Sequence, residues 1–384
     1  MSRAVLITGA RAPAALDLAR SFTAAGYDAH LADSTPSALG NASNAPAGVH
    51  RYSAPRLDRQ GFRRDIARLV ARLDPVLVVP TCEEVFHLAA AAPALGFAER
   101  LFAPDLQRLG RLHAKAAFAD LCARLGLDAP ATRRIDSAEE LAVFAPTAEA
   151  LVFKPDYSRF GHRALVRPSP HRLARLRPTP AEPWVAQDAV LGREVCFYAA
   201  ARAGELVAFC AYAPRWQDAG GASYAFEPVG GDLGERLRRA ANVLARNAVG
   251  TGQFACDAIA DADGRPWLIE CNPRATSGVH LFGRSPDLAL AMLGGEPCDP
   301  RPGLRYLAPA MWLFGLPQAL RKGRLAQWRT DLREGEDVTG APGDRLPALG
   351  AAVDGLGFQA AALIHGRPLA EQMTRDMCWN GETL

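Results

Sequence analysis

Three polar side chains alternate along an apolar stretch near residue 270. The segment "WLIECNPR" carries Glu270, Asn272 and Arg274 at every second position, after the bulky run Trp267–Ile269. Alternate residues of a β-strand lie on one face, so these side chains are expected to point the same way. Either this face of the strand is solvated, or the three groups hold a ligand.

An aspartate on the preceding strand is expected to join this face. The turn "DADG" at 261–264 indicates a hairpin, and pairing its two ends sets Asp257 opposite Leu268. Asp257 then lies within a diagonal step of Glu270 and Asn272. Two carboxylates and an amide oxygen repel one another unless protons or a hard cation lie between them. This set of oxygens is typical of a Mg²⁺ site completed by phosphates and water.

Basic residues that could neutralise phosphate accompany the hairpin. Arg274 offers a planar fork to a phosphate or a carboxylate. Of the 44 Lys and Arg residues only three are lysines, and two of them, Lys115 and Lys154, precede the hairpin. Lys154 ends an apolar strand and is followed by "PDYSRFGHR", where Ser158 and Gly161 suit a loop that grips phosphate. Arg and Lys are not interchangeable where a compact, mobile ammonium is needed, so the few lysines of this chain are of interest.

A linker between these two regions could hold a nucleoside. The segment "WVAQDAVLGREV" sets Gln187 and Glu194 seven residues apart. Backbone groups of Asp188, Ala189 and Val190 could face an adenine ring, while Glu194 accepts hydrogen bonds from ribose hydroxyls. Taken singly, each of these features is explained at least as well by ordinary structure.

The elements before residue 103 alternate between strand and helix. Apolar strands are predicted at 4–8, 29–32 and 76–79, with helices at 13–26 and 58–73. This βαβ alternation predicts a parallel, Rossmann-like sheet domain. Gly9 and Asp33 invite a dinucleotide interpretation, but the further glycines of that fingerprint are missing.

The pattern of predicted helices and strands changes after this domain. One helix is predicted over 105–125, strand pairs over 151–212, a glycine-rich loop over 217–232, a helix over 233–248, and then the hairpin. The last 80 or so residues are expected to be mostly helical and irregular. The chain is therefore predicted to be multidomain, combining α/β and α+β classes.

In this order the motifs resemble the ATP-grasp superfamily, over about residues 105–285. The branch that contains carbamoyl-phosphate synthetase, biotin carboxylase and amino-acid ligases is the most similar. The resemblance implies a Rossmann-like pre-ATP-grasp domain at 1–103, followed by a two-subdomain ATP-grasp fold. The small subdomain would span 104–186 and the large one 187–300. The extension at 301–384 would complete the grasp or form an oligomer surface, such as that of a homodimer.

The resemblance also implies roles for the residues named above. Lys115 and Lys154 would hold the α- and β-phosphates of ATP, and the linker would hold adenosine. Asp257, Glu270 and Asn272 would bind two Mg²⁺ ions, for which Mn²⁺ can substitute. The phosphate loop contains fewer glycines than the double-glycine form of the family.

The implied activity is ATP-dependent ligation of a small carboxylic acid to an amine. Arg274 would steady the transferred phosphoryl group or the acyl phosphate, and ADP and phosphate would be released. The segments 216–226 and 275–282 are candidates for the substrate side. There Arg215 could hold a substrate carboxylate, and Ser277 or the backbone of Gly278 could orient the acyl group.

Other functions fit the sequence less well. Carbamoyl-phosphate synthesis needs two grasp modules, and the chain has no internal repeat. Biotin carboxylation suits the length, but the carboxylase pattern beyond Asn-x-Arg is not evident. An NAD-dependent dehydrogenase and a non-catalytic binding module are the alternatives from other classes.

The composition limits the class of protein and the compartment in which it is expected to work. Hydrophobic residues make up 49% and charged residues 22%, which is typical of a soluble globular protein. The net charge of +3 argues neither for nor against nucleic acid, but no basic run with interleaved aromatic residues is present, so no nucleic-acid partner is expected. No apolar run is expected to span a membrane, and the amino-terminal segment fails as an export signal. The eight scattered cysteines suit a reducing cytoplasm.

Overall fold

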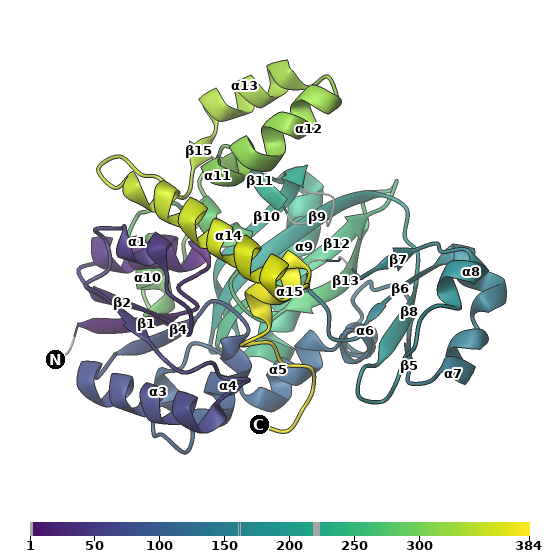
Figure 1. Ribbon diagram of the computed structural model, residues 1–384, viewed down its shortest axis with the longest axis horizontal. Coiled ribbons are helices and arrows are strands. Elements are labelled where there is room, and N and C mark those ends of the chain that lie inside the picture. The colour runs from purple at the N-terminus through teal and green to yellow at the C-terminus, as the bar shows by residue number, and fades with distance from the viewer. Residues whose placement is uncertain (1–2, 160, 162, 218–222) are drawn as a thin grey trace.

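A parallel sheet forms the amino-terminal part of the fold (Figure 1). The computed structural model describes residues 3–159, 161, 163–217 and 223–384. The sheet has the order β3-β2-β1-β4 and consists of β1 (Ala4–Thr8), β2 (Asp28–Asp33), β3 (Gly48–Arg51) and β4 (Leu77–Pro80). Its helices are α1 (Pro13–Ala24), α2 (Ala38–Asn41), α3 (Arg59–Leu73) and α4 (Glu84–Ala91). The three strands predicted here are confirmed, and the structure adds α2 and β3, which were not predicted. That this sheet is Rossmann-like stays a prediction.

A smaller antiparallel sheet follows, with the order β5-β8-β6-β7. Its strands are β5 (Thr132–Ile135), β6 (Leu151–Pro155), β7 (Leu165–Val166) and β8 (Trp184–Asp188), and its helices are α7 (Ala138–Ala142) and α8 (Pro170–Leu173). The single helix predicted over 105–125 is wrong. The structure has α5 (Leu106–His113) and α6 (Lys115–Arg124), because Asp156 accepts a hydrogen bond from the N–H of Ala116 and caps α6.

The third sheet contains seven strands in the order β13-β12-β9-β10-β11-β14-β15. They are β9 (Arg193–Arg202), β10 (Glu205–Gln217), β11 (Ser223–Pro228), β12 (Gly252–Ala260), β13 (Pro266–Asn272), β14 (Arg305–Tyr306) and β15 (Glu336–Asp337). The glycine-rich loop predicted over 217–232 is wrong for residues 223–228, which form β11. Residues 218–222, part of the predicted substrate segment 216–226, lie outside the described residues.

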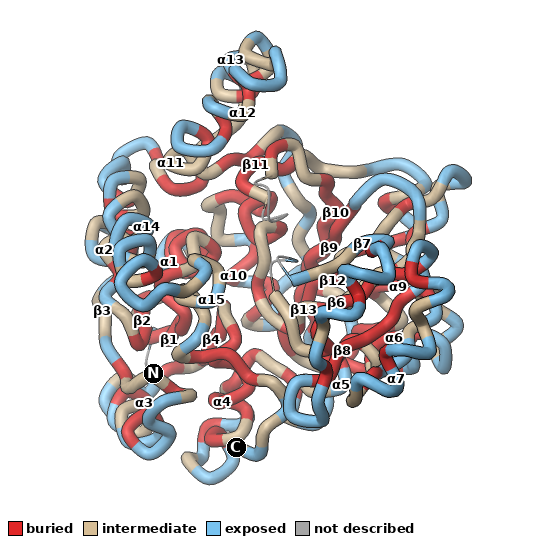
Figure 2. Tube along the Cα trace, turned by 45° about the vertical axis from the view of Figure 1, so that its right-hand side comes forward, coloured by how far each residue is buried: buried red, intermediate tan, exposed pale blue. Residues whose placement is uncertain are grey.

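Both faces of this large sheet are covered, as Figure 2 shows along its central strands. Alternate residues of β9 contribute to different cores. Cys196 and Tyr198 join the core shared with β1 and α1, whereas Val195 and Phe197 pack toward α9 (Gly231–Leu244) and α6. This period of two, with both faces buried, explains why β9 is apolar without a break from Val195 to Ala201.

The carboxy-terminal part is helical, as predicted. It contains α10 (Asp287–Met292), α11 (Ala308–Ala310), α12 (Leu316–Arg321), α13 (Leu325–Glu334), α14 (Leu346–Ile364) and α15 (Leu369–Thr374). Short 3₁₀ or π helices are η1 (Ala98–Arg100), η2 (Ala145–Ala150), η3 (Ala245–Val249), η4 (Ser277–Phe282) and η5 (Met311–Gly315). The expectation that no segment could span a membrane needs correction. Helix α14, with 19 residues and a mean hydropathy of 1.3, is long and apolar enough to cross a membrane, by length and composition only.

The carboxy-terminal tail is tied to the parallel sheet through Arg11. This guanidinium lies 2.5 Å from Asp33 and 2.7 Å from Asp376, and it donates to the carbonyl of Met373. Gly9, at φ +74°, has no room for a Cβ, which would lie 2.5 Å from the Thr81 hydroxyl. The two residues behind the dinucleotide interpretation, Gly9 and Asp33, therefore serve packing and ion pairing.

Loss of this buried ion pair is expected to destabilise the protein. Arg11→Met leaves two carboxylates without their cation, which costs roughly 3 kcal/mol. Thermal unfolding should shift down by about 4 °C. The control is Arg68→Met, whose partner is Asp65 and whose side chain is 76% exposed, and it should leave the midpoint unchanged. Equal midpoints for the two variants would show that Arg11 does not hold the tail.

Candidate active site

The hairpin of β12 and β13 brings two carboxyl groups face to face. Asp257 lies directly opposite Glu270, because a bulge after Asp257 shifts the register, so the predicted pairing of Asp257 with Leu268 is wrong. Asn272, opposite Ala255, donates from Nδ2 to Asp257 Oδ2 at 3.4 Å. The bulge thus brings the three side chains closer together than the diagonal arrangement expected from the sequence.

Two lysines from different elements converge on Glu270. Lys115 Nζ lies 3.5 Å and Lys154 Nζ 3.6 Å from Glu270 Oε2, and both lysines are almost fully buried. Lys115 starts α6 rather than lying in the middle of a helix, and its side chain reaches Glu270 on β13. Lys154 Nζ also donates to the carbonyl of Ile269 at 3.2 Å.

Burial and neighbouring charges shift the pKa values of Glu270, Lys154 and Asp257. Burial alone would raise the pKa of Glu270, but the charges of Lys115 and Lys154 outweigh it and lower that pKa to about 2. Burial lowers the pKa of Lys154 to about 8, although Glu270 opposes the change. Burial and the Glu270 charge raise the pKa of Asp257 to about 7. One carboxylate of the pair is thus neutralised by lysines, while the other lacks a cation.

The donor set suits a hard cation next to phosphates. Among the described residues, no group of three or more His, Cys, Asp or Glu side chains could hold a metal alone. Asp257, Glu270 and Asn272 offer only oxygen, and a partial set of this kind fits Mg²⁺ that takes the rest of its ligands from phosphate oxygens and water. The raised pKa of Asp257 marks the carboxyl that a cation would deprotonate.

The predicted nucleoside linker is partly engaged in the small sheet. Gln187 Nε2 donates to the Thr132 hydroxyl at 2.9 Å and to the carbonyl of Ile269 at 3.3 Å. The N–H groups of Asp188 and Ala189 donate to the carbonyls of residues 131 and 150. These two N–H groups are therefore not available to an adenine ring, which leaves the backbone of Val190 as the better candidate.

Two further linker and loop positions predicted for the nucleotide are Glu194 and the loop after β6. Glu194 is exposed on β9 and accepts a hydrogen bond from Gln217 at 2.9 Å. The carbonyl of Ser158 accepts from Lys115 Nζ at 3.1 Å, so the loop after β6 begins beside the lysines. Gly161 has φ +64°, a conformation that favours glycine. The neighbouring positions 160 and 162 of the predicted phosphate loop lie outside the described residues.

Sequence reasoning missed how the loop after β6 is fastened. Arg159 forms an ion pair with Glu83 and donates to Asn380 Oδ1 and to the carbonyl of Trp379. Burial would raise the pKa of Glu83, but the Arg159 charge outweighs it and lowers the pKa to about 2. These partners lie 76 and about 220 residues away in the chain, so no local pattern could have indicated them.

The predicted substrate residues are dispersed. Arg274 donates to Asn272 Oδ1 at 3.3 Å and to the carbonyl of Ala275, so it stays beside the carboxylates. Arg215 is 3.2 Å from Asp331 and 3.6 Å from Glu227, so a substrate carboxylate would have to displace acidic partners there.

Ser277 and Gly278 start η4, which packs on the large sheet. Ser277 is half-buried and Gly278 is buried. A Cβ at residue 278 would lie 2.3 Å from Tyr198, so close packing alone requires this glycine. The orientation of an acyl group by Ser277 or Gly278 stays a prediction.

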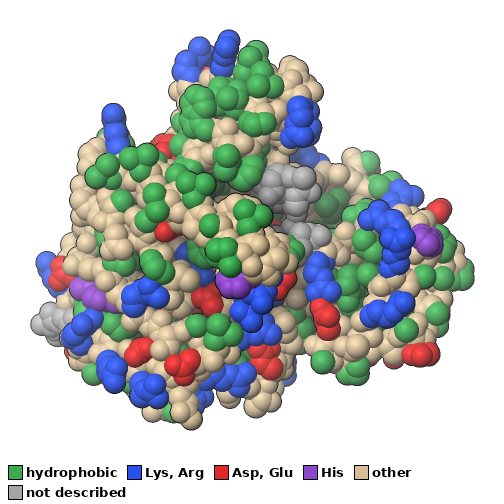
Figure 3. All heavy atoms as spheres, viewed as in Figure 1, with side chains coloured by type: hydrophobic (Ala, Val, Ile, Leu, Met, Phe, Trp, Pro, Cys, Tyr) green, Lys and Arg blue, Asp and Glu red, His purple; other side chains and the backbone are tan. Residues whose placement is uncertain are grey.

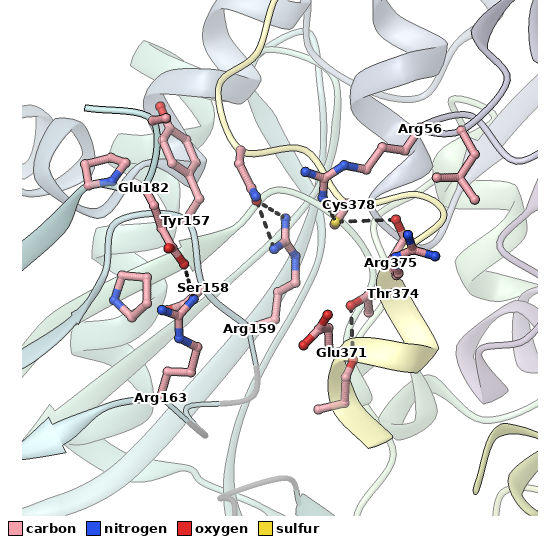
Figure 4. Close-up of a pocket in the computed structure, with 16 residues that line it drawn as sticks. Arg56, Tyr157, Ser158, Arg159, Arg163, Glu182, Glu371, Thr374, Arg375 and Cys378 are labelled. Carbon is pink, nitrogen blue, oxygen red and sulfur yellow. Dashed lines mark hydrogen bonds and ion pairs between the residues drawn. The ribbon is translucent and has the colours of Figure 1, made fainter. Parts of the chain in front are cut away.

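A cavity of about 440 Å³ adjoins the loop after β6 (Figure 4). Its charged lining consists of Arg56, Arg159, Arg163, Arg375, Glu182 and Glu371. Arg163 pairs with Glu182 and Arg159 with Glu83. Within the described part of the chain, the Arg375 guanidinium has no hydrogen bond or ion pair, so it is the cation open to an anionic ligand.

The facing carboxyl groups should lower stability when no cation is bound. Asp257→Asn removes the repulsion, so we expect a melting temperature about 2–4 °C higher without Mg²⁺ and ATP. The same variant should lose the additional stabilisation that Mg²⁺ and ATP give to the unsubstituted protein. Asp263→Asn, at an exposed turn residue, is the control for the change in charge. A lower melting temperature for Asp257→Asn would contradict this account of the pair.

Comparisons with known proteins identify the fold. No protein-family model matches the sequence, and no curated protein matches it. The structure is similar to the L-amino acid ligase from Bacillus licheniformis, with a TM-score of 0.58 and 14% identity over 78% of each chain. It is also similar to N5-carboxyaminoimidazole ribonucleotide synthetase from Thermus thermophilus, with a TM-score of 0.61 and 16% identity over 78% of this chain and 81% of that chain.

A third similar structure was solved with nucleotide and metal. It is the biotin carboxylase domain dimer of the Hydrogenobacter thermophilus 2-oxoglutarate carboxylase, in complex with MgADP, ADP and bicarbonate. Its TM-score is 0.61, with 12% identity over 79% of this chain and 73% of that chain. At these identities the likeness establishes the fold, and the chain therefore has the ATP-grasp fold that its motifs resemble.

Proposed function

We propose that this protein is an ATP-dependent carboxylate–amine ligase, which forms an amide or peptide bond through an acyl phosphate. The observation that carries the proposal is the convergence of Lys115 and Lys154 on Glu270, with Asp257 directly opposite. Two buried ammonium groups and two carboxyl groups from four elements suit phosphates and a divalent cation side by side. The likeness to an amino acid ligase and to a carboxylase domain holding MgADP supports the same chemistry.

The residues would exchange partners when ATP binds. Lys115 and Lys154 would turn from Glu270 to the phosphate oxygens, which carry more charge than one carboxylate does. Asp257, Glu270 and Asn272 would hold two Mg²⁺ ions, or Mn²⁺ in their place. When bound, Mg²⁺ offsets the charge that develops on the transferred phosphoryl group.

The acid would receive the γ-phosphoryl group beside Arg274. A carboxylate oxygen attacks phosphorus, the bond to the β-phosphate oxygen breaks, and ADP leaves. The amine nitrogen then attacks the acyl carbon, loses a proton, and phosphate leaves. Arg274, held next to Asn272, would neutralise the acyl phosphate during both steps.

The arginine-lined cavity is the proposed binding site for the acid. Ser158 lines this cavity and its carbonyl accepts a hydrogen bond from Lys115, so the cavity adjoins one of the two lysines proposed to hold phosphate. Arg375 would pair with an anionic group on the acid. Because all eight cysteines are free thiols, we propose that the enzyme works in a reducing cytoplasm.

The proposal predicts ADP release that depends on both substrates. A panel of amino acids and small acids, with and without amines, is incubated with Mg²⁺ and ATP. Lys154→Ala and Glu270→Ala should each lower ADP release about 100-fold or more. Lys322→Ala removes the remaining, exposed lysine and should change nothing. Equal turnover in all variants would contradict the site.

The same assay separates the main alternative, a bicarbonate-phosphorylating enzyme. That alternative is favoured by the likeness to a carboxylase domain solved with bicarbonate. ADP release stimulated by bicarbonate, and by no organic acid, would support it over the ligase.

Substitution in the cavity is expected to affect the acid and not the nucleotide. Arg375→Ala should raise KM for the acid about fivefold, because one exposed charge pair is worth about 1 kcal/mol. KM for ATP should stay the same. The control is Arg172→Ala, an exposed arginine on α8. An unchanged KM for the acid would show that the acid does not bind in this cavity.

A further inference from the structure

Helix α14 carries an uncovered apolar stripe with the spacing of a coiled-coil seam. Its members are Leu346, Leu349, Val353, Leu356, Ala360 and Leu363, separated by three and four residues in turn. The five large ones are between 60% and 73% exposed, and Ala360 is exposed as well. Figure 3 shows hydrophobic side chains gathered over α14 and over the neighbouring α11–α13 lobe, on the same face of the molecule.

The opposite face of α14 fixes the helix to the body of the protein. Gly350 is buried where a Cβ would lie 2.4 Å from the carbonyl of Ala38, so α14 and α2 are in backbone contact. Asp354, the one charged residue of α14, accepts hydrogen bonds from the N–H groups of Ala38 and Leu39 at 2.8 and 2.9 Å. The helix therefore uses its small and polar residues inward and leaves the stripe outward.

The spacing indicates another helix as the partner. Apolar residues that repeat every 3.5 positions on average keep one seam against a neighbouring helix, whereas scattered surface leucines have no such period. The stripe runs the length of α14, about 28 Å at the usual helical rise. Beside it lie Gly357, Ala352 and Gln359, which are uncharged and mostly small, so a second helix can approach closely.

The order of residue sizes along the stripe suits a second copy of α14 running in the opposite direction. A two-fold axis midway between Asp354 and Gly355 sets Leu346 against Leu363 of the other copy. The same axis sets Leu349 against Ala360 and Val353 against Leu356. Every layer then pairs two apolar residues, and no two like charges meet across the axis.

A membrane surface fits the helix less well. Helices that lie on membranes carry Lys or Arg on their polar face. α14 has no basic residue between 346 and 364, and its polar side is occupied by α2. We propose that the protein forms a homodimer through antiparallel pairing of α14 with α14 of a second copy, independently of the activity proposed above.

Solution mass measurements test this interface. Light scattering after size exclusion should give twice the chain mass of 41.0 kDa for the unsubstituted protein. Leu356→Glu buries a charge in the central layer and should raise the dimer dissociation constant about 100-fold or more. Val143→Glu, at a residue 74% exposed on another part of the surface, should leave the dimer intact. A monomeric unsubstituted protein, or a Leu356→Glu variant that still dimerises, would overturn the proposal.

Cross-linking tests the direction of pairing. When Val353→Cys and Leu356→Cys proteins are mixed and oxidised, disulfides should form between the two variants in preference to either variant with itself. Self-linking of Val353→Cys alone would indicate parallel helices and overturn the antiparallel arrangement. Flotation with vesicles of phosphatidylcholine and phosphatidylserine is run alongside. Vesicle binding that Leu356→Glu abolishes, without a dimer in solution, would replace the proposal with a membrane surface.

Discussion

The charge of Glu270 is the constraint on which the candidate site depends. This carboxylate stays ionised only because Lys115 and Lys154 lie 3.5 and 3.6 Å away. The two lysines come from α6 and β6, so the ion pairs exist only when the small sheet is docked against β13. Docking is reinforced at the adjacent residue, where the carbonyl of Ile269 accepts from Lys154 and Gln187. The charge arrangement of the site therefore forms only when the small sheet packs against the large one.

The basic residues divide according to what they hold. Arg11 and Arg159 make several directed hydrogen bonds each, and both tie the carboxy-terminal tail to other parts of the chain. A planar guanidinium suits such fixed connections. The two lysines at Glu270 make fewer and longer contacts, which suits groups that must change partners. Lysine is scarce in this chain, yet two of its three lysines converge on one carboxylate. This contrast with the arginines supports different roles for the two residue types.

The sequence was sufficient for the features that depend on local pattern. The strands β1, β2, β4 and β13, and the sharing of one face by Asp257, Glu270 and Asn272, follow from periods of apolar residues. The register at Asp257 could not be predicted, because a bulge depends on how the whole strand packs against β9. The break before Lys115 depends on Asp156, which is distant in sequence. The fastening of the loop after β6 depends on Glu83 and the tail, and no spacing rule connects them.

The distant contacts that sequence reasoning missed also explain why the tail is part of the fold. Asp376 binds Arg11 at the edge of the parallel sheet, and Trp379 and Asn380 bind Arg159 in the loop after β6. The tail therefore connects the parallel sheet to the loop that is proposed to lie over phosphate. Helix α14 precedes this tail and is held on α2 by Gly350 and Asp354. A helix anchored so closely on one side has little freedom to move. It cannot readily turn to bury the apolar stripe on its other side, so a partner helix is the better means of covering that stripe.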